Sequence, residues 1–143
     1  TAGDAAGDTY HGVEVVYGSA FGDTITGDSA NNRLVGNDGD DVLNGGTGND
    51  YLLGGLGDDE LTGGAGRDVY LFEGVLGNDT VTDFEAGTGI DDRIWFRGMG
   101  VDDMSDLTIN DVGDDTVIDV SGFGSLTLTG ISSADLVLDD FIF

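Results

Sequence analysis

The chain contains GGTGNDYLL (45–53), GGLGDDELT (54–62) and GGAGRDVYL (63–71), three uninterrupted copies of one nine-residue pattern. Each copy reads G-G-x-G-x-D-x-U-x, where U is a large apolar residue and Tyr70 takes that place in the third copy. Three preceding blocks keep the same register less strictly, namely GSAFGDTIT (18–26), GDSANNRLV (27–35) and GNDGDDVLN (36–44). A fixed internal period of this kind indicates an array of stacked units.

Three positions of the repeat form columns. Position 1 is always Gly, position 6 carries Asp or Asn, and position 8 is large and apolar. A looser seventh copy, GVLGNDTVT (74–82), follows the two-residue insertion Phe72–Glu73 and supplies Asp79 and Val81. The position-8 column runs Ile25, Leu34, Leu43, Leu52, Leu61, Tyr70.

The segment before the array repeats the pattern imperfectly. GDAAGDTYH (3–11) echoes it with Asp8 and Tyr10, but 12–17 is too short to continue the register. We expect 1–17 to form a degenerate N-terminal coil, with Tyr10, Val13 and Val16 in the interior column.

The spacing predicts a fold from backbone geometry alone. Positions 7–9 form a three-residue strand whose central side chain points inward, because side chains alternate along a strand. Positions 1–6 turn sharply, and Gly permits the positive φ that such turns need. Two strands and two turns close a coil of 18 residues, and coils stack at roughly 4.8 Å. We therefore predict an all-β fold, a right-handed parallel β-roll (β-helix) with a C-terminal antiparallel β cap.

The charge of the chain suggests that this roll needs a counter-ion. Its 29 acidic residues face four basic ones, for a formal charge of −25, yet 38% of residues are hydrophobic. Stacked position-6 carboxylates ~4.8 Å apart repel each other by roughly 3–4 kcal/mol at an effective dielectric of about 20. One large apolar residue per repeat cannot offset this, so we expect the roll to be unfolded or molten without cations. Asx-type turns would explain an isolated Asp, but not one that recurs every nine residues.

These blocks resemble the repeats-in-toxin (RTX) nonapeptides of type I-secreted bacterial proteins. The resemblance implies several Ca²⁺ ions between stacked turns, held by the position-6 Asp and by carbonyls around positions 2 and 4. No stretch matches the EF-hand loop. The strongest predicted bridging pairs are Asp41–Asp59 and Asp50–Asp68, and Asp23–Asp41 and Asn32–Asp50 are weaker. Asp59–Asp79 forms a further pair if a bulge absorbs the insertion at Phe72–Glu73. The predicted metal ligands are Asp23, Asn32, Asn37, Gly39, Asp41, Gly46, Gly48, Asp50, Gly55, Gly57, Asp59, Gly64, Gly66, Asp68 and Asp79.

Residues 18–82 form the predicted roll, and 83–143 lose the nine-residue period. The stretches 107–110, 116–120 and 126–129 read as short antiparallel strands joined by the turn signals VGDD and GFGS. We interpret 83–143 as a β-rich cap over the open end of the roll, because repeat arrays need caps. Trp95 and Phe96 are either core residues, the more common case, or an exposed platform for stacking sugars.

The chain ends in Asp140-Phe-Ile-Phe143. These residues are either a final docking strand or, by resemblance to RTX proteins, part of an uncleaved C-terminal type I secretion signal. The resemblance implies a secreted, extracellular module that folds on Ca²⁺ binding outside the cell, after transient contact with the type I secretion apparatus. It would support the secretion and stability of a covalently attached upstream passenger domain. Because the chain starts at Thr1, we expect it to be a piece of a longer protein.

Composition also weighs against other functions. Phosphate binding needs Lys and Arg, of which the chain has only four, so nucleic acid is not expected as a partner. No apolar run approaches the length that spans a membrane, so membrane insertion is not expected either. His11 is the sole histidine, Cys is absent, and no G-x-S-x-G or H-E-x-x-H motif occurs, so we expect no enzyme activity. Two alternatives stay open: a module that uses Ca²⁺ only structurally and binds a carbohydrate (a polysaccharide) or a cell surface, and a fragment of an enzyme whose β-helix carries the active site.

Overall fold

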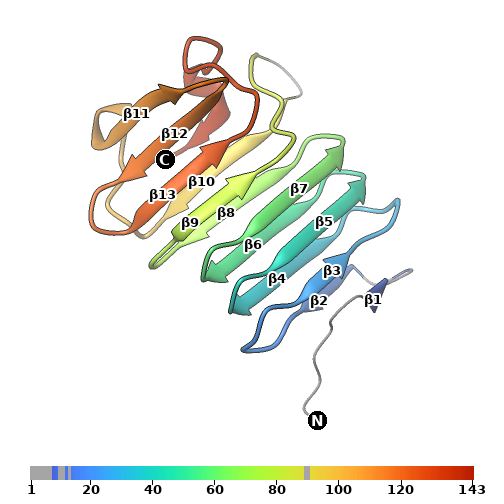
Figure 1. Ribbon diagram of the computed structural model, residues 1–143. Helices are drawn as coiled ribbons and strands as arrows, with labels where there is room; N and C mark the ends of the chain where they lie inside the picture. The colour runs from blue at the N-terminus through green and yellow to red at the C-terminus, as the bar shows by residue number, and fades with distance from the viewer. Residues whose placement is uncertain (1–7, 10–11, 13, 89–90) are drawn as a thin grey trace.

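The computed structural model describes residues 8–9, 12, 14–88 and 91–143, which form two stacked sheets around one interior (Figure 1). The expectations for Tyr10, His11 and Val13 lie outside the described residues. The short strand β1 pairs with β3 so that Asp8 lies beside Ile25. This register is displaced by two residues from the one that the echo GDAAGDTYH suggests, in which Asp8 would be level with Asp23.

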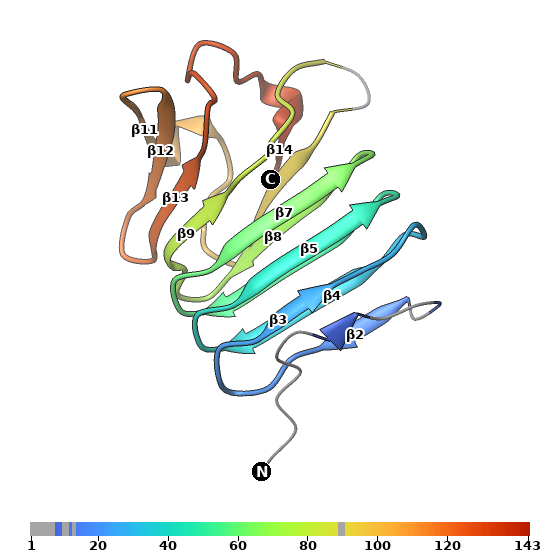
Figure 2. The same ribbon diagram turned by 45° about the vertical axis from the view of Figure 1, so that its right-hand side comes forward.

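The repeats alternate between the two sheets, and every strand pair within the roll is parallel (Figure 2). One sheet has eight strands in the order β1-β3-β5-β7-β9-β13-β12-β11, and the other has six in the order β14-β10-β8-β6-β4-β2. From β2 to β8 the residues in register are 18 apart, as in Leu43 beside Leu61 and Leu34 beside Leu52, whereas β7 and β9 pair at a separation of 20. The predicted right-handed parallel β-roll of 18-residue coils is confirmed. The roll strands are β1 (Asp8–Thr9), β2 (Val15–Tyr17), β3 (Thr24–Thr26), β4 (Arg33–Asp38), β5 (Val42–Thr47), β6 (Tyr51–Leu56), β7 (Glu60–Ala65), β8 (Val69–Glu73) and β9 (Gly77–Val81).

The strands are longer than the repeat pattern predicted. Strands β4 to β7 have six residues each rather than three. Pairing continues through positions 2 and 3, for example between Gly46 and Gly64, because hydrogen bonding between coils uses the backbone and needs no side chain.

The position-8 column fills the interior. Ile25, Leu34, Leu43, Leu52, Leu61 and Tyr70 are all completely buried. Val16 and Val81 extend the column at either end, as predicted. Each repeat therefore contributes one position-8 side chain to the apolar core, which limits how much the core stabilises the fold.

The C-terminal part combines a cap with additional parallel strands. Strands β11 (Leu107–Val112), β12 (Asp115–Val120) and β13 (Gly124–Leu128) form an antiparallel meander, and β13 also pairs in parallel with β9. Strand β10 (Arg93–Arg97) pairs in parallel with β8, and β14 (Phe141–Ile142) pairs in parallel with β10. The description of 83–143 as antiparallel is thus incomplete, because β10 and β14 continue the roll. Two 3₁₀ turns, η1 (Met104–Asp106) and η2 (Leu138–Asp140), complete the cap.

The two neighbouring aromatic residues of β10 point in opposite directions. Phe96 is buried in the core against Phe72, with ring centroids 5.7 Å apart. Trp95 is half-buried on the outer face and packs against Tyr51. The core interpretation is right for Phe96 and wrong for Trp95, as strand alternation requires. Within the described residues, no helix has the length and apolarity needed to cross a membrane.

Candidate metal centre

The position-6 side chains form two continuous ladders, one along each edge of the roll. In each ladder the backbone N–H of one residue donates to Oδ1 of the Asp one coil further on. The distances are 2.7 Å from Asp23 to Asp41, 2.8 Å from Asp41 to Asp59 and 3.0 Å from Asp59 to Asp79. On the other edge they are 2.7 Å from Asn32 to Asp50, 2.7 Å from Asp50 to Asp68 and 2.8 Å from Asp68 to Asp92.

All the ladder residues are buried, although their side chains are charged or polar. In five of them one carboxylate oxygen has no hydrogen-bond partner in the described part of the chain. These oxygens are Asp23 Oδ1, Asp41 Oδ2, Asp50 Oδ2, Asp59 Oδ2 and Asp68 Oδ2. A buried charged oxygen left without a partner costs about 1–3 kcal/mol or more, and buried polar groups are nearly always satisfied. The fold therefore presents two columns of buried oxygens, one along each edge of the roll, that a cation would satisfy.

The glycine at position 1 explains how these oxygens are arranged. A Cβ on Gly36, Gly45, Gly54 or Gly63 would overlap Oδ2 of the Asp at position 6 of the same repeat. On Gly36 and Gly45 it would also overlap the carbonyl oxygen of the position-1 glycine one coil further on. Carboxylate and carbonyl oxygens thus crowd the same space, and the invariant glycine leaves room for them.

Glycines at positions 2 and 4 bring further carbonyls close to the next coil. Gly55 has φ +121° and Gly64 has φ +97°, and a Cβ there would overlap the carbonyl oxygens of Asn37 and Gly46 respectively. A Cβ on Gly57 or Gly66 would likewise overlap the carbonyl oxygen of Gly39 or Gly48. The carbonyl oxygens predicted to bind the metal therefore lie between stacked turns, on the same turns as the Asp ladders.

The candidate metal ligands are all oxygen atoms, and few of them belong to side chains. No three acidic or imidazole side chains of the described residues converge on one point. A cation between two turns would thus combine carboxylate oxygens with backbone carbonyls. This chemistry suits Ca²⁺, which accepts six to eight oxygens including carbonyls, and it suits transition metals poorly.

Burial raises the pKa of the ladder carboxyl groups. The pKa values of Asp41, Asp50 and Asp59 rise to about 6, because burial disfavours the charged form. The backbone N–H bonds oppose the shift and nearby aspartates add to it. The same causes raise the pKa of Asp92 to about 7 and that of Asp79 to about 8. A nearby cation would therefore stabilise the charged form of these groups.

Sequence reasoning missed Asp92, which completes the second ladder. It follows Asp68 in the stack because β10 pairs with β8, and it precedes Arg93 and Ile94 as Asp68 precedes Val69 and Tyr70. The available signal was AGTGID (86–91), which matches the turn of the repeat except for Ala86, together with the D-x-U fragment at 92–94. The pattern would place Asp91 rather than Asp92 at position 6, so the two parts are out of register by one residue. Both oxygens of Asp92 are satisfied, by the N–H groups of Asp68 and Glu85. Asp92 therefore ends the ladder without leaving an unpartnered oxygen.

A second set of ladders at position 5 was also missed. Here the direction is reversed: the side-chain oxygen of one residue accepts from the backbone N–H one coil later. Asp40 accepts from Asp58, and Asp58 accepts from Asn78. On the other edge Asn31 accepts from Asn49, and Asn49 accepts from Arg67. These residues are exposed and bond the turns directly, so the Asp and Asn at position 5 have a structural role that needs no ion.

The parallel coils, glycine-lined turns and stacked carboxylates define a calcium-binding type of β-roll. The sequence model of a family described as RTX calcium-binding nonapeptide repeat (4 copies) matches residues 3–43, 17–52 and 35–70. Residues 3–70 of the chain thus match the repeats of this RTX calcium-binding family. No curated protein matches the chain significantly.

Solved structures share the whole fold, cap included. The AlgE6R3 subunit of the mannuronan C5-epimerase from Azotobacter vinelandii is 28% identical with a TM-score of 0.70, over 94% of this chain and 86% of that one. The AlgE6R2 subunit of the same enzyme is 26% identical with a TM-score of 0.67, over 90% and 91%. The extracellular lipase LipA of Serratia marcescens shares the fold at 18% identity and a TM-score of 0.52, over 95% of this chain and 40% of the lipase.

Proposed function

We propose that this module binds several Ca²⁺ ions between its stacked turns and that this binding drives its folding. The observation that carries the proposal is the set of buried carboxylate oxygens that lack a partner among the described residues. They belong to Asp23, Asp41 and Asp59 on one edge and to Asp50 and Asp68 on the other. Bound Ca²⁺ would supply the positive charge that these oxygens lack. In the proposed sites, Asp41 pairs with Asp59 and Asp50 pairs with Asp68, with carbonyls of positions 1, 2 and 4 completing the oxygen shell.

Folding and binding are coupled in this proposal. An ion that binds only the folded chain stabilises it by RT ln(1 + [L]/Kd) at each site. Each inner Asp of a ladder takes part in contacts with the coil before and the coil after, so the sites are linked. We therefore expect a steep, cooperative transition in the range of extracellular Ca²⁺ modules, about 10⁻⁴–10⁻³ M.

The test is far-ultraviolet circular dichroism of the module during titration from chelator to ~10 mM Ca²⁺. The expected result is a cooperative change from coil to β-structure. The same titration with Mg²⁺ should leave the spectrum largely unchanged, because Mg²⁺ demands a compact octahedral shell and releases its waters reluctantly. A full β spectrum in chelator, unchanged by Ca²⁺, would contradict the proposal.

We further propose that the module belongs to a secreted protein and acts through folding rather than catalysis. In this proposal the chain passes a type I exporter unfolded at low Ca²⁺, folds outside the cell and stabilises an upstream passenger. The support is the RTX family of residues 3–70 together with the acidic and apolar C-terminal residues 140–143. The experiment is to attach residues 132–143 to a small unfolded reporter in cells that carry a type I exporter. Reporter in the medium is expected, and retention equal to that of a reporter without the segment would reject the secretion role.

A further inference from the structure

The side-chain amide of Asn44 lies directly before a glycine that the candidate ion site needs. Asn44 stands at position 9 of its repeat, and it is the one asparagine of the chain that is followed by glycine. That glycine, Gly45, is buried, and a Cβ on it would overlap Oδ2 of Asp50 and the carbonyl oxygen of Gly63. The glycine of this Asn-Gly step therefore cannot be replaced without disturbing the site.

An Asn-Gly step can react within the chain. The backbone nitrogen of the glycine loses its proton and attacks Cγ of the asparagine, ammonia leaves, and a five-membered succinimide ring forms. Water then opens the ring at either carbonyl group. One product is aspartate, and the other is isoaspartate, in which the main chain runs through Cγ. Glycine favours ring closure because its backbone is free to turn and no Cβ obstructs the attack.

The fold holds Asn44 and Gly45 away from this reaction. Both residues lie in β5, where Asn44 pairs with Thr26 on one side and with Thr62 on the other. The carbonyl oxygen of Asn44 accepts a 2.7 Å hydrogen bond from the N–H of Gly27. In such an extended strand the backbone nitrogen that follows Asn44 is directed away from Cγ. The ring can therefore close only when this part of β5 leaves the sheet.

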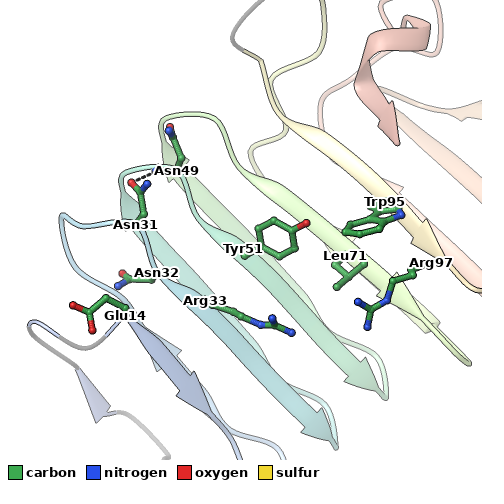
Figure 3. A pocket seen from close by; sticks show the side chains of 9 residues that line it. All are labelled: Glu14, Asn31, Asn32, Arg33, Asn49, Tyr51, Leu71, Trp95 and Arg97. Atoms are coloured by element: carbon green, nitrogen blue, oxygen red, sulfur yellow. Dashed lines mark hydrogen bonds between the residues drawn. The ribbon is translucent and has the colours of Figure 1, made fainter. Parts of the chain in front are cut away.

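The asparagines of the position-5 ladder differ from Asn44. The side-chain oxygen of Asn31 accepts a 2.9 Å hydrogen bond from the backbone N–H of Asn49 (Figure 3). The side-chain oxygen of Asn49 in turn accepts from the N–H of Arg67. Each of these two asparagines is followed by a residue that carries a side chain, which obstructs attack by the backbone nitrogen. The reaction is thus directed to Asn44.

We propose that Asn44 is a site of covalent self-modification, closed in the calcium-loaded roll and open in the unfolded chain. Its dependence on calcium rests on the proposed function, because the ions are what keep β5 in the sheet. A chain that waits without calcium loses the amide of Asn44 irreversibly, as unfolded chains do when chemical change outpaces refolding. The Asn-Gly step thus acts as a timer that limits how long the unfolded chain stays able to fold.

Isoaspartate at position 44 would damage the ion site that follows it. It adds one carbon to the main chain of β5 between two register pairs, Leu43 with Leu61 and Gly46 with Gly64, so the two pairs cannot both keep their register. The turn that carries Asp50 is displaced as a result, and the modified chain should need more Ca²⁺ to fold. Aspartate at the same position changes only the charge of an outward-pointing side chain.

The test follows the modification by mass spectrometry of the peptide that spans 44–45, with the two isomeric products separated by chromatography. Samples are kept at mildly alkaline pH in chelator, in saturating Ca²⁺, and in concentrated urea with chelator. Both products should accumulate in urea and in chelator. In Ca²⁺ their formation should be at least about tenfold slower, because the reaction must wait for opening of β5. After chelator is replaced by Ca²⁺, the isoaspartate fraction should stay unfolded at a concentration that folds fresh protein.

Two variants separate the reaction from the residue. Asn44→Gln would have to close a six-membered ring, which is much slower, so this variant should keep its Ca²⁺ midpoint during storage in chelator. Asn44→Asp carries the charge of one product without the added main-chain carbon. Its midpoint should shift by about twofold or less, because the side chain points to the outer face of the sheet.

Three results would overturn the proposal. Absence of both products in urea would reject the site itself. Equal rates with and without Ca²⁺, in samples whose β spectra differ, would reject protection by the fold. Asn44→Gln protein that loses its Ca²⁺ response in storage as fast as wild type would place the damage elsewhere. A module that is already fully β-structured in chelator would instead count against the proposed function, and the urea sample would still test the site.

Discussion

The backbone N–H of Asp41 donates a 2.8 Å hydrogen bond to Oδ1 of Asp59, while Oδ2 of Asp59 is buried without a partner. One carboxylate thus has two different tasks. Its Oδ1 holds two coils in register, and its Oδ2 is the oxygen that we assign to calcium. The two tasks can be separated by changing charge without changing shape.

Asp59→Asn makes that separation. The amide keeps an oxygen that can accept from Asp41 but removes the negative charge, so the Ca²⁺ midpoint of folding should rise roughly tenfold and the transition should become less steep. The measurement is the Ca²⁺ titration followed by circular dichroism.

The matched control is Asp58→Asn, at the adjacent position 5. Asp58 is exposed, and its Oδ1 accepts from Asn78, a bond that the amide can also make. We expect its midpoint to shift by about twofold or less. Equal shifts in the two variants would mean that total charge, rather than the position-6 site, governs folding.

The raised pKa values predict how the metal-free module responds to pH. The pKa values of Asp41, Asp50 and Asp59 are about 6 and that of Asp79 about 8 in the fold, against an ordinary 3.8. Between about pH 4 and pH 8 the folded chain therefore binds more protons than the unfolded chain, and its stability must fall as pH rises. Metal-free protein, freed of ions on a chelating resin, should show more β-structure and a higher Tm at pH 4.5 than at pH 8.

Calcium should reverse this trend. Ions and protons compete for the same carboxylates, so the Ca²⁺ midpoint should fall as pH rises over this range. Metal-free protein that gains β-structure on going from pH 4.5 to pH 8 would be incompatible with buried, uncompensated ladders.

Gly54→Ala tests the space beside the carboxylate. The atoms nearest to an added Cβ all belong to the Asp59 side chain, and the Gly54 backbone does not need a positive φ. The methyl group should therefore displace the carboxylate and raise the Ca²⁺ midpoint, although it changes no charge. In a double-mutant cycle with Asp59→Ala the two effects should be non-additive by about 0.5–3 kcal/mol, because the second change removes the two nearest colliding atoms, Oδ2 and Cγ, and leaves only Cβ. Additive free energies would indicate that Gly54 serves only the backbone.

The sequence predicts the roll well because its period is strict. Leu43 and Leu61 fall in register 18 residues apart because position 8 recurs without insertions, and strand alternation then places Asp41 and Asp59 in one ladder. The insertion at Phe72–Glu73 did not prevent Asp79 from taking its place above Asp59. Here local pattern and stacking geometry agree, so little information beyond the period was needed.

The remaining features depend on contacts between distant segments. Asp92 joins its ladder only because β10 stacks on β8 across a 24-residue separation that lacks the period. Trp95 points outward because the neighbouring Phe96 enters the core. The residue types alone do not indicate which of these two aromatic side chains is the buried one. Glycine is needed at position 1 because the carboxylate five residues later occupies the space of its Cβ, and this contact exists only in the folded turn.

The C-terminal residues should close the roll. Phe141 is buried beside Ile94 on the open edge of β10, and both carboxylate oxygens of Asp140 accept backbone N–H bonds, from Gly87 and Val137. Loss of a buried aromatic side chain costs about 3 kcal/mol, so Phe141→Ala should lower Tm and raise the Ca²⁺ midpoint.

Phe143→Ala is the matched control, because Phe143 stacks on Phe141 at 5.9 Å but is 42% exposed. It should have less than about half the effect of Phe141→Ala, since an exposed ring loses little on removal. Thermal unfolding in saturating Ca²⁺ measures both variants, and a Phe141→Ala protein as stable as wild type would show that the end of the chain does not hold the roll closed.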